Sequence, residues 1–219
     1  MMQKVLIGIC VMLLILCSAG AVSANLITNG SFEHSDGALP GHTTLPDGST
    51  AIPGWTVYGS VDWIGTYWPA SDGYRSLDLA GYYATGAVVS DKFATVAGQE
   101  YKVQFDLAGN PDAGYDKVAF GVTLSGSGQL FTFDQDLGTL LDMGWQTKSF
   151  TFLAVELATQ IAFGDYTFGA PSNNAWGAAI DNVQVDPVPV APVPEPATML
   201  LLGSGLIGLA GIRRKIKKS

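Results

Sequence analysis

Cysteine is nearly absent from this sequence: the chain has two, Cys10 and Cys17, and both lie in its apolar N-terminal stretch. The central part, residues 25–186, therefore cannot build a disulfide framework, a thiol nucleophile or a zinc–thiolate site. Basic residues are also few there, five against 18 acidic residues, which gives a net charge of −13. Because no basic patch can displace the counterions of phosphates, we exclude nucleic acid as a partner, and also electrostatic docking on anionic lipid.

Recognisable catalytic motifs are missing as well. The two histidines, His34 and His42, share one predicted loop, and the sequence has neither a G-x-S-x-G elbow nor an H-E-x-x-H motif. Two carboxylates about 5 to 9.5 Å apart suffice for glycoside hydrolysis, but such pairs arise by chance in a chain this acidic. We therefore expect a protein that is not an enzyme.

The N-terminus has the layout of a secretory signal peptide. Lys4 precedes a 12-residue apolar run, Val5–Leu16, and small residues follow as far as Ala24. A helix of that length spans about 18 Å, which is short for a hydrocarbon core of about 30 Å. We predict a signal helix over residues 1–24 that is cleaved before Asn25, so that the mature protein leaves the cytoplasm.

The C-terminus falls into three parts. Residues 187–196 are rich in alternating prolines, which favour an extended spacer. Residues 197–212 carry no charge and are predicted to form a transmembrane helix, although 16 residues are few for a bilayer. The basic tail, residues 213–219, should stay on the cytoplasmic side. The sequence thus predicts an external domain, residues 25–186, that is tethered by its C-terminus.

This order of a Pro194-Glu195-Pro196 motif, an apolar segment and a basic cluster resembles the PEP-CTERM sorting signal of Gram-negative bacteria that make extracellular polymeric substance. The resemblance implies that an exosortase-type membrane protease recognises Pro194, Glu195 and Pro196 while the protein is held in the inner membrane. It also implies a secreted or cell-surface location after processing. An ordinary single-span anchor is the alternative.

The domain shows the alternation of apolar and polar residues that is typical of half-buried strands. In the stretch 101–107, Tyr101, Val103, Phe105 and Leu107 fall on one face. The stretches 118–124, 131–133, 150–152 and 161–163 repeat the pattern, and Gly, Asn, Asp and Pro clusters separate them. Little helix is expected beyond a turn at 137–143. We predict an all-β antiparallel sandwich of roughly ten short strands.

Six short motifs support a family resemblance. In chain order they are NGSFE at 29–33, IPGWTV at 52–57, VDWIG at 61–65, RSLDLAG at 75–81, FDLAGN at 105–110 and AIDNV at 179–183. With these motifs the domain resembles the choice-of-anchor C family, which is similar to the galactose-binding-like carbohydrate-binding modules. The resemblance implies a jelly-roll β-sandwich and leaves the ligand open.

Glu33 and Asp181 are the candidate metal ligands. The first and last strands of a jelly roll commonly lie side by side, so these carboxylates should converge, and converging carboxylates need protons or a cation. The resemblance implies a structural Ca²⁺ there, a hard cation that prefers oxygen ligands. The alternative makes Glu33 an exposed strand residue and Asp181 a turn former. A second oxygen-rich stretch, residues 110–116, has the composition of a hairpin turn.

Aromatic residues concentrate between Trp55 and Tyr83, where three Trp and five Tyr occur within 29 residues. Sugars stack their apolar faces on such rings. Trp55 begins a predicted strand and belongs to the core. The candidate ligand-binding residues lie in or beside loops and are Tyr67, Trp68, Arg75 and Tyr82. The alternatives are that the rings close the end of the sandwich and that Arg75, the only arginine of the domain, pairs with Asp72 or Asp78.

These observations predict an exported, non-catalytic protein that binds extracellular polysaccharide or another matrix polymer. A structural matrix protein without specific glycan binding is the second hypothesis, and a small glycan hydrolase or lyase is the third. Exposed aromatic rings favour binding, inward rings favour a structural role, and a cleft with converging carboxylates favours an enzyme.

Overall fold

A computed structural model describes residues 25–33, 40–82, 84–112, 117–123, 128–134, 137–167, 176–189 and 203–205. The predicted signal helix and nearly all of the predicted transmembrane segment lie outside these residues. Within the described part, no helix is long and apolar enough to cross a bilayer. One compact unit ends at Val188, and residues 189–219 form a second unit.

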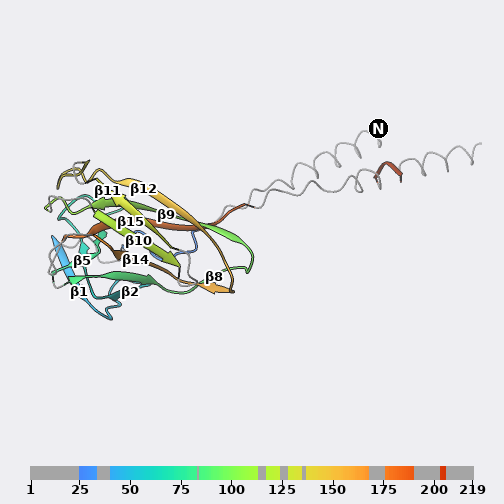
Figure 1. Ribbon diagram of the computed structural model, residues 1–219, viewed down its shortest axis with the longest axis horizontal. Coiled ribbons are helices and arrows are strands. Elements are labelled where there is room, and N and C mark those ends of the chain that lie inside the picture. The colour runs from blue at the N-terminus through green and yellow to red at the C-terminus, as the bar shows by residue number, and fades with distance from the viewer. Residues whose placement is uncertain are drawn as a thin grey trace, which may run out of the picture. The chain divides into compact units, whose positions relative to one another are not determined.

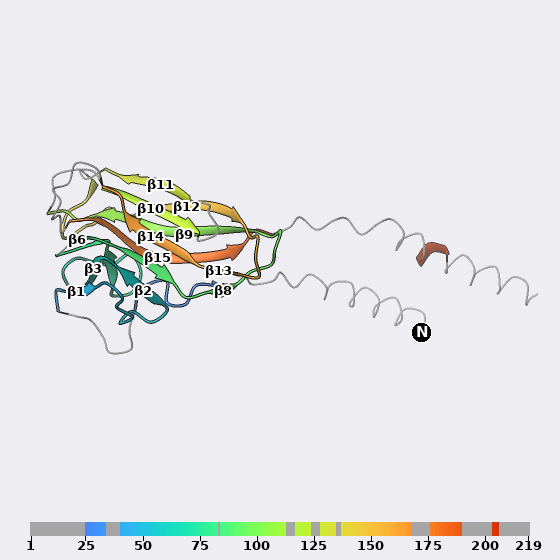
Figure 2. The same ribbon diagram turned by 60° about the horizontal axis from the view of Figure 1, so that its bottom comes forward.

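In the described part of the first unit nearly all regular secondary structure is β-strand, and the strands are arranged in two layers, as predicted (Figures 1 and 2). One sheet has the order β1-β3-β4-β15-β9-β12, and the other has the order β11-β10-β14-β7-β2. Every pairing is antiparallel, including the two small sheets β13-β8 and β5-β6. The strands are β1 His42–Pro46, β2 Trp55–Tyr58, β3 Ser60–Ile64, β4 Ser76–Asp78, β5 Ala80–Gly81, β6 Ala84–Thr85, β7 Ala87–Ser90, β8 Phe93–Ala94, β9 Glu100–Gly109, β10 Lys117–Thr123, β11 Gly128–Phe133, β12 Gln146–Leu153, β13 Ala158–Thr159, β14 Ile161–Asp165 and β15 Ala178–Pro187.

The core lies between the two large sheets. In β9 the predicted inward residues are all buried, whereas Lys102 on the other face is exposed. The ring of Phe105 in one sheet lies 4.8 Å from that of Phe163 in the other, so aromatic contacts join the layers. Trp55 begins β2 and is 1% exposed, which confirms its predicted place in the core.

The N-terminal segment of the domain runs beside the last strand. Leu26 N–H donates to the Val185 carbonyl at 3.0 Å, and Val183 N–H donates to the Gly30 carbonyl at 2.9 Å. A side chain at position 30 would collide with the Val183 backbone, so only glycine allows this approach. The two ends of the domain therefore meet, which is the arrangement expected from a jelly roll.

The prediction of a hairpin turn at residues 110–116 was wrong. Asn110–Asp112 do form a turn, in which Asn110 Oδ1 accepts the Asp112 N–H at 3.0 Å. However, β9 and β10 belong to different sheets, so the segment crosses from one layer to the other. Turn chemistry predicts that the chain bends but does not predict which sheet receives the next strand. Residues 113–116 lie outside the described part.

Candidate functional site

Four aspartates occupy one face of the six-stranded sheet. Asp62 of β3 is paired with Asp78 of β4, and Asp106 of β9 is paired with Asp181 of β15. Paired residues share a face, and Asp78 also pairs with Ala179, two residues before Asp181. Leu77 and Trp63 lie on the opposite face, toward the core. The face that faces away from the second sheet is therefore acidic, although each of the four aspartates is at most 6% exposed.

A loop covers these aspartates. Gly65–Arg75, which we call the strap, joins β3 to β4 across the acidic face. Its Ser71 and Asp72 N–H groups donate to Asp181 Oδ2 at 2.7 and 2.9 Å, and the Ser71 hydroxyl donates to Asp106. The indole N–H of Trp145 also reaches the strap, at the Pro69 carbonyl, 3.1 Å away. The strap is thus fixed to the sheet by several separate hydrogen bonds.

Glu33 and Asp181 hold the same strap from two directions. Glu33 Oε1 accepts the N–H groups of Tyr74 at 2.6 Å and Arg75 at 2.8 Å. Asp181 is fully buried, and burial raises its pKa to about 8, although the N–H groups of Asp72, Asn182 and Ser71 lower it. The structure therefore brings both predicted metal ligands to one segment.

The surroundings of Glu33 and Asp181 give these carboxylates a role that needs no cation. Backbone N–H groups of the strap donate hydrogen bonds to their oxygens. Among the described residues, no group of three or more His, Cys, Asp or Glu side chains could hold a metal ion. The Ca²⁺ site at Glu33 and Asp181 stays a prediction.

Next to the strap is a pocket with a volume of about 240 Å³. Its size is slightly below the usual range for drug-sized ligands, about 300 to 1,000 Å³, and suits one small ring. Three of the four predicted binding residues line it, namely Tyr67, Trp68 and Tyr82. The remaining lining residues are His42, Asp62, Ile64, Asp78, Asn110 and Trp176.

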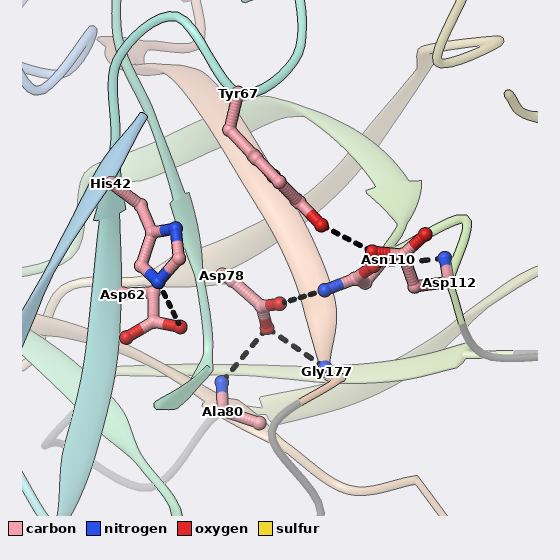
Figure 3. Close-up of polar contacts among 8 residues, drawn as sticks. All are labelled: His42, Asp62, Tyr67, Asp78, Ala80, Asn110, Asp112 and Gly177. Carbon is pink, nitrogen blue, oxygen red and sulfur yellow. Dashed lines mark hydrogen bonds and ion pairs between the residues drawn. The ribbon is translucent and has the colours of Figure 1, made fainter. Parts of the chain in front are cut away.

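The buried residue Asp78 belongs to the lining of the pocket, and its carboxylate accepts several hydrogen bonds (Figure 3). Its Oδ1 accepts the N–H groups of Ala80 at 2.9 Å and Gly177 at 2.8 Å, and its Oδ2 accepts Asn110 Nδ2 at 2.8 Å. Burial raises the pKa of Asp78 to about 8, the hydrogen bonds from Asn110 and the backbone lower it, and neighbouring Asp62 raises it further. Asp78 therefore fixes Asn110 and the start of β15 around the pocket.

Asp62 is less completely paired. Its Oδ2 lies 3.8 Å from His42 Nε2, whereas its buried Oδ1 has no hydrogen-bond partner among the described residues (Figure 3). Burial raises the pKa of Asp62, while the Thr44 hydroxyl, His42 and the Tyr82 backbone N–H lower it. A buried acceptor without a donor costs free energy unless a ligand or water supplies one.

The rim of the pocket is aromatic. Tyr67, Tyr82 and Trp176 are 37%, 70% and 42% exposed. The Tyr67 hydroxyl donates to the Asp112 carboxylate, and this hydrogen bond is the main reason why the Tyr67 pKa is raised. Its ring packs edge-on against His42, with 5.4 Å between the ring centroids. The rim thus presents ring surfaces to solvent while the polar groups lie deeper.

Two predicted binding residues are placed differently from the expectation. Trp68 is 3% exposed, and its indole N–H donates to Ser76 Oγ at 2.9 Å, so it forms the inner wall of the pocket rather than an exposed platform. Arg75 is 2% exposed, does not line the pocket, and holds its Cζ 4.3 Å from the centroid of the Trp63 ring. Stacking on Trp63 explains the burial of Arg75, because a guanidinium is more weakly hydrated than an ammonium.

The sequence did not indicate Asp62, Asp78, Asn110 or Trp176 as pocket residues. Asp62 and Asp78 occur within apolar strands, on the face opposite to their apolar neighbours. The strap covers that face, and no local pattern predicts the path of a loop. Acidic residues flanked by Val61 and Trp63, or by Leu77 and Leu79, were the available signal.

A second hollow lies on the other side of Tyr67 and Trp68. Its volume is about 360 Å³, and its lining includes Tyr74, Leu140 and Leu141. Tyr74 is 71% exposed and Leu141 is 91% exposed. Tyr67 and Trp68 therefore line both hollows.

The fold and the pocket define a β-sandwich domain with an acidic, aromatic-rimmed pocket, followed by a separate C-terminal unit. The chain belongs to the family described as "Protein of unknown function (DUF642)", which matches residues 25–186. A PEP-CTERM protein-sorting motif matches residues 192–215, including Pro194, Glu195 and Pro196. This motif indicates export and C-terminal sorting in a Gram-negative bacterium. The choice-of-anchor C assignment stays a resemblance.

The chain is also similar to part of Halomucin from Haloquadratum walsbyi. The two are 32% identical over 219 residues, a match that covers 89% of this chain and 2% of Halomucin. This chain therefore spans only a small fraction of the length of that relative.

Three solved structures with a similar fold are carbohydrate-binding modules. The CBM22-1 xylan-binding domain from Paenibacillus barcinonensis Xyn10C is 13% identical with a TM-score of 0.43, and the match covers 68% of this chain and 95% of that chain. TmCBM61 in complex with β-1,4-galactotriose is 15% identical with a TM-score of 0.43, and the match covers 76% of this chain and 100% of that chain. The family 35 carbohydrate binding module from Clostridium thermocellum is 13% identical with a TM-score of 0.45, and the match covers 66% of this chain and 98% of that chain. At such low identities and TM-scores, the ligand of this chain has to be argued from its own pocket.

Proposed function

We propose that this protein is an exported surface or matrix protein whose sandwich binds a glycan, without catalysis, in the pocket beside the strap. The observation that carries the proposal is the combination of exposed rings at the rim, Tyr67, Tyr82 and Trp176, with hydrogen-bonding groups below them. Sugar rings have apolar faces that stack on aromatic side chains and hydroxyl groups that bond to carboxylates and amides. The pocket offers both.

The absence of catalysis is also part of the proposal. Asp62 and Asp78 converge, which by itself would suit a hydrolase. However, Asp78 is fully buried and both of its oxygens accept hydrogen bonds from Asn110, Ala80 and Gly177. A fully buried carboxylate held in this way supports the pocket wall.

Export would place the domain outside the cell, where it can contact a glycan. The PEP-CTERM motif supports passage through the inner membrane and processing by an exosortase-type protease near Pro194–Pro196. The acidic domain would then lie in or on the extracellular polymer. We infer that its ligand is a polysaccharide of that matrix and that neutral or cationic polymers are preferred over acidic ones, which the net charge of −13 repels.

Affinity electrophoresis through gels containing individual polysaccharides tests the proposal. Tyr82→Ala and Trp176→Ala remove exposed rings from the pocket rim and should abolish retardation while leaving the melting temperature nearly unchanged. Tyr58→Ala is the matched control, because Tyr58 is a 53% exposed ring on β2 of the other sheet. Equal retardation of parent and rim variants by every polymer would favour the structural matrix hypothesis instead.

A further inference from the structure

We propose that the end of the sandwich opposite the pocket is a membrane-contact surface, which lies on the lipid headgroup region while the chain is held by its C-terminal apolar segment. The surface consists of exposed aliphatic side chains on two adjoining turns, and we call it the aliphatic tip. Its members are Val96, Leu153, Val155 and Leu157. The inference uses the predicted transmembrane segment 197–212 and is independent of glycan binding.

The two turns of the aliphatic tip are bonded to each other. Gly98 N–H donates to the Ala154 carbonyl at 2.8 Å, and Thr95 N–H donates to the Leu157 carbonyl at 3.0 Å. Strand β9 begins beside these turns, and its ten residues extend over about 34 Å before they reach Asn110 of the pocket lining. Figure 2 accordingly shows β8 and β13 at one end of the sandwich and β1 and β6 at the other.

The exposed apolar side chains at the two ends differ in kind. The members of the aliphatic tip are 56 to 77% exposed, and none of them is aromatic. The exposed rings of Tyr67, Tyr82 and Trp176 line the pocket instead. Aliphatic side chains present no ring face to a sugar and make no hydrogen bonds, so they gain free energy only by leaving water. The aliphatic tip therefore suits an apolar partner rather than a glycan.

The chain leaves the sandwich at the aliphatic tip. Val188 N–H donates to the Glu100 carbonyl at 2.8 Å, and the Gln99 amide donates to the Val188 carbonyl at 2.8 Å. Only the eight residues 189–196 then separate Val188 from the apolar segment. An extended proline-rich chain advances about 3.1 Å per residue, so these eight residues reach about 25 Å. Once the apolar segment is in a bilayer, the aliphatic tip is the end of the domain that is kept near it.

The first residue of the domain lies at the same end. Asn25 Oδ1 accepts the Val185 N–H at 2.9 Å, three residues before Val188. The predicted signal peptide, residues 1–24, is joined directly to Asn25. Both long apolar segments of the chain are therefore connected to the end that carries the aliphatic tip. This connection identifies a lipid surface as its partner from translocation until sorting.

Charge shows that the contact is an apolar one. The segments 91–102, 153–159 and 185–188, which form this end, contain four acidic and two basic residues. They give no attraction to anionic lipid. Binding then depends on the buried apolar area, which is small for four side chains. The tether compensates for this weakness, because a short linker makes the contact intramolecular at a high effective concentration. The aliphatic tip thus orients the domain, with its pocket away from the bilayer, until cleavage releases it.

Fluorescence of the full chain in phosphatidylcholine vesicles tests the inference. Cys10→Ala and Cys17→Ala remove the native thiols, and an environment-sensitive dye is attached to a single new cysteine. In Leu157→Cys the dye should lose about half of its emission to lipids that carry a spin label just below the headgroup, the depth at which interfacial apolar groups lie. Leu141→Cys is the matched control, because Leu141 is 91% exposed and precedes β12 at the pocket end. In Ser204→Cys the dye reports insertion of the apolar segment.

The pattern of quenching decides the outcome. Quenching at positions 157 and 204 but not at 141 supports the inference, and Val96→Ser combined with Val155→Ser should then weaken quenching at 157 without changing the melting temperature. Quenching at 204 alone, or equal quenching at 157 and 141, overturns an orienting contact. Absence of quenching at all three positions overturns the anchor on which the inference depends. Quenching at 157 that disappears below one copy per vesicle assigns the aliphatic tip to contact between copies and also overturns it.

Discussion

Asp62 and Asp78 stand directly opposite each other on neighbouring strands, and both belong to the lining of the same pocket. Like charges in this position repel, and Asp62 contributes to the raised pKa of Asp78. The consequence of this pairing is a pocket that favours protons or positive charge, which is the property that our first prediction examines.

The stability of the domain should fall as the pH rises from about 4 to about 8. Burial raises the pKa of Asp78 and of Asp181 from 3.8 to about 8, so between these values the folded state binds more protons than the unfolded state. The free energy of unfolding then decreases with increasing pH. Urea unfolding at pH 5, 6, 7 and 8 measures this trend, and Asp78→Asn should reduce the slope. A free energy of unfolding that increases with pH in the parent would instead show that these carboxylates are ionised over this range.

Trp68→Ala should destabilise the domain by about 3 to 5 kcal/mol, the usual cost of removing a large buried aromatic side chain. Trp68 is 3% exposed and its N–H is bonded to Ser76, so truncation leaves both a cavity and an unpaired hydroxyl. Tyr82→Ala, at a 70% exposed ring, should change the free energy of unfolding by less than about 0.5 kcal/mol. Chemical denaturation of both variants tests the contrast. Similar decreases in the free energy of unfolding of the two variants would mean that Trp68 and Tyr82 contribute equally to stability.

Ca²⁺, the cation predicted at Glu33 and Asp181, should raise the melting temperature of the parent. A ligand that binds only the folded state stabilises it by about 2.7 kcal/mol at a hundredfold excess over Kd. Glu33→Gln and Asp181→Asn should lose this response and should also loosen the strap, whose N–H groups they hold. Scanning calorimetry with Ca²⁺ and with chelator separates the two effects. Equal melting temperatures with Ca²⁺ and with chelator would show that these carboxylates bind no Ca²⁺ and act only as hydrogen-bond acceptors.

Both ends of the chain should be removed during export. We expect mass spectrometry of the cell-surface or secreted protein to find Asn25 at its start and to find no residues of the basic tail 213–219. The expectation follows from the signal-peptide layout and from the sorting motif at 192–215. Recovery of mature protein with an intact Arg213–Ser219 tail would argue for an ordinary membrane anchor.

The sandwich could be predicted from the sequence because its strands carry their own periodic signal. Tyr101, Val103, Phe105 and Leu107 alternate with polar residues, and all four are buried. The meeting of the N-terminal segment with β15 was also expected, from the topology of jelly rolls. These features depend on local pattern and on a general rule of chain connection.

The pocket was only partly predictable. Its rim residues Tyr67 and Tyr82 were expected because aromatic side chains in loops are conspicuous. Asp78 and Arg75 depend on where the strap lies, which is decided by contacts such as those of Ser71 with Asp181 and Asp106, 110 and 35 residues away. Interactions between such distant positions leave no mark in a local window. This is why Arg75 was expected at the ligand and instead lies buried on Trp63.

Strand β15 directly connects the pocket to the point where the chain leaves the sandwich. Gly177, just before the strand, donates to Asp78 of the pocket lining, and Val188, just after it, donates to the Glu100 carbonyl at 2.8 Å. The ten residues between them extend over about 34 Å and are bonded to β9 along most of their length, with β4 and then the N-terminal segment on the other side. Antiparallel bonds lie perpendicular to the strands. If a polymer were bound as proposed and the chain were held beyond Val188, a pull between the two would act along β15 and load these bonds together in shear. The same pull applied across the sheet would open the bonds one at a time.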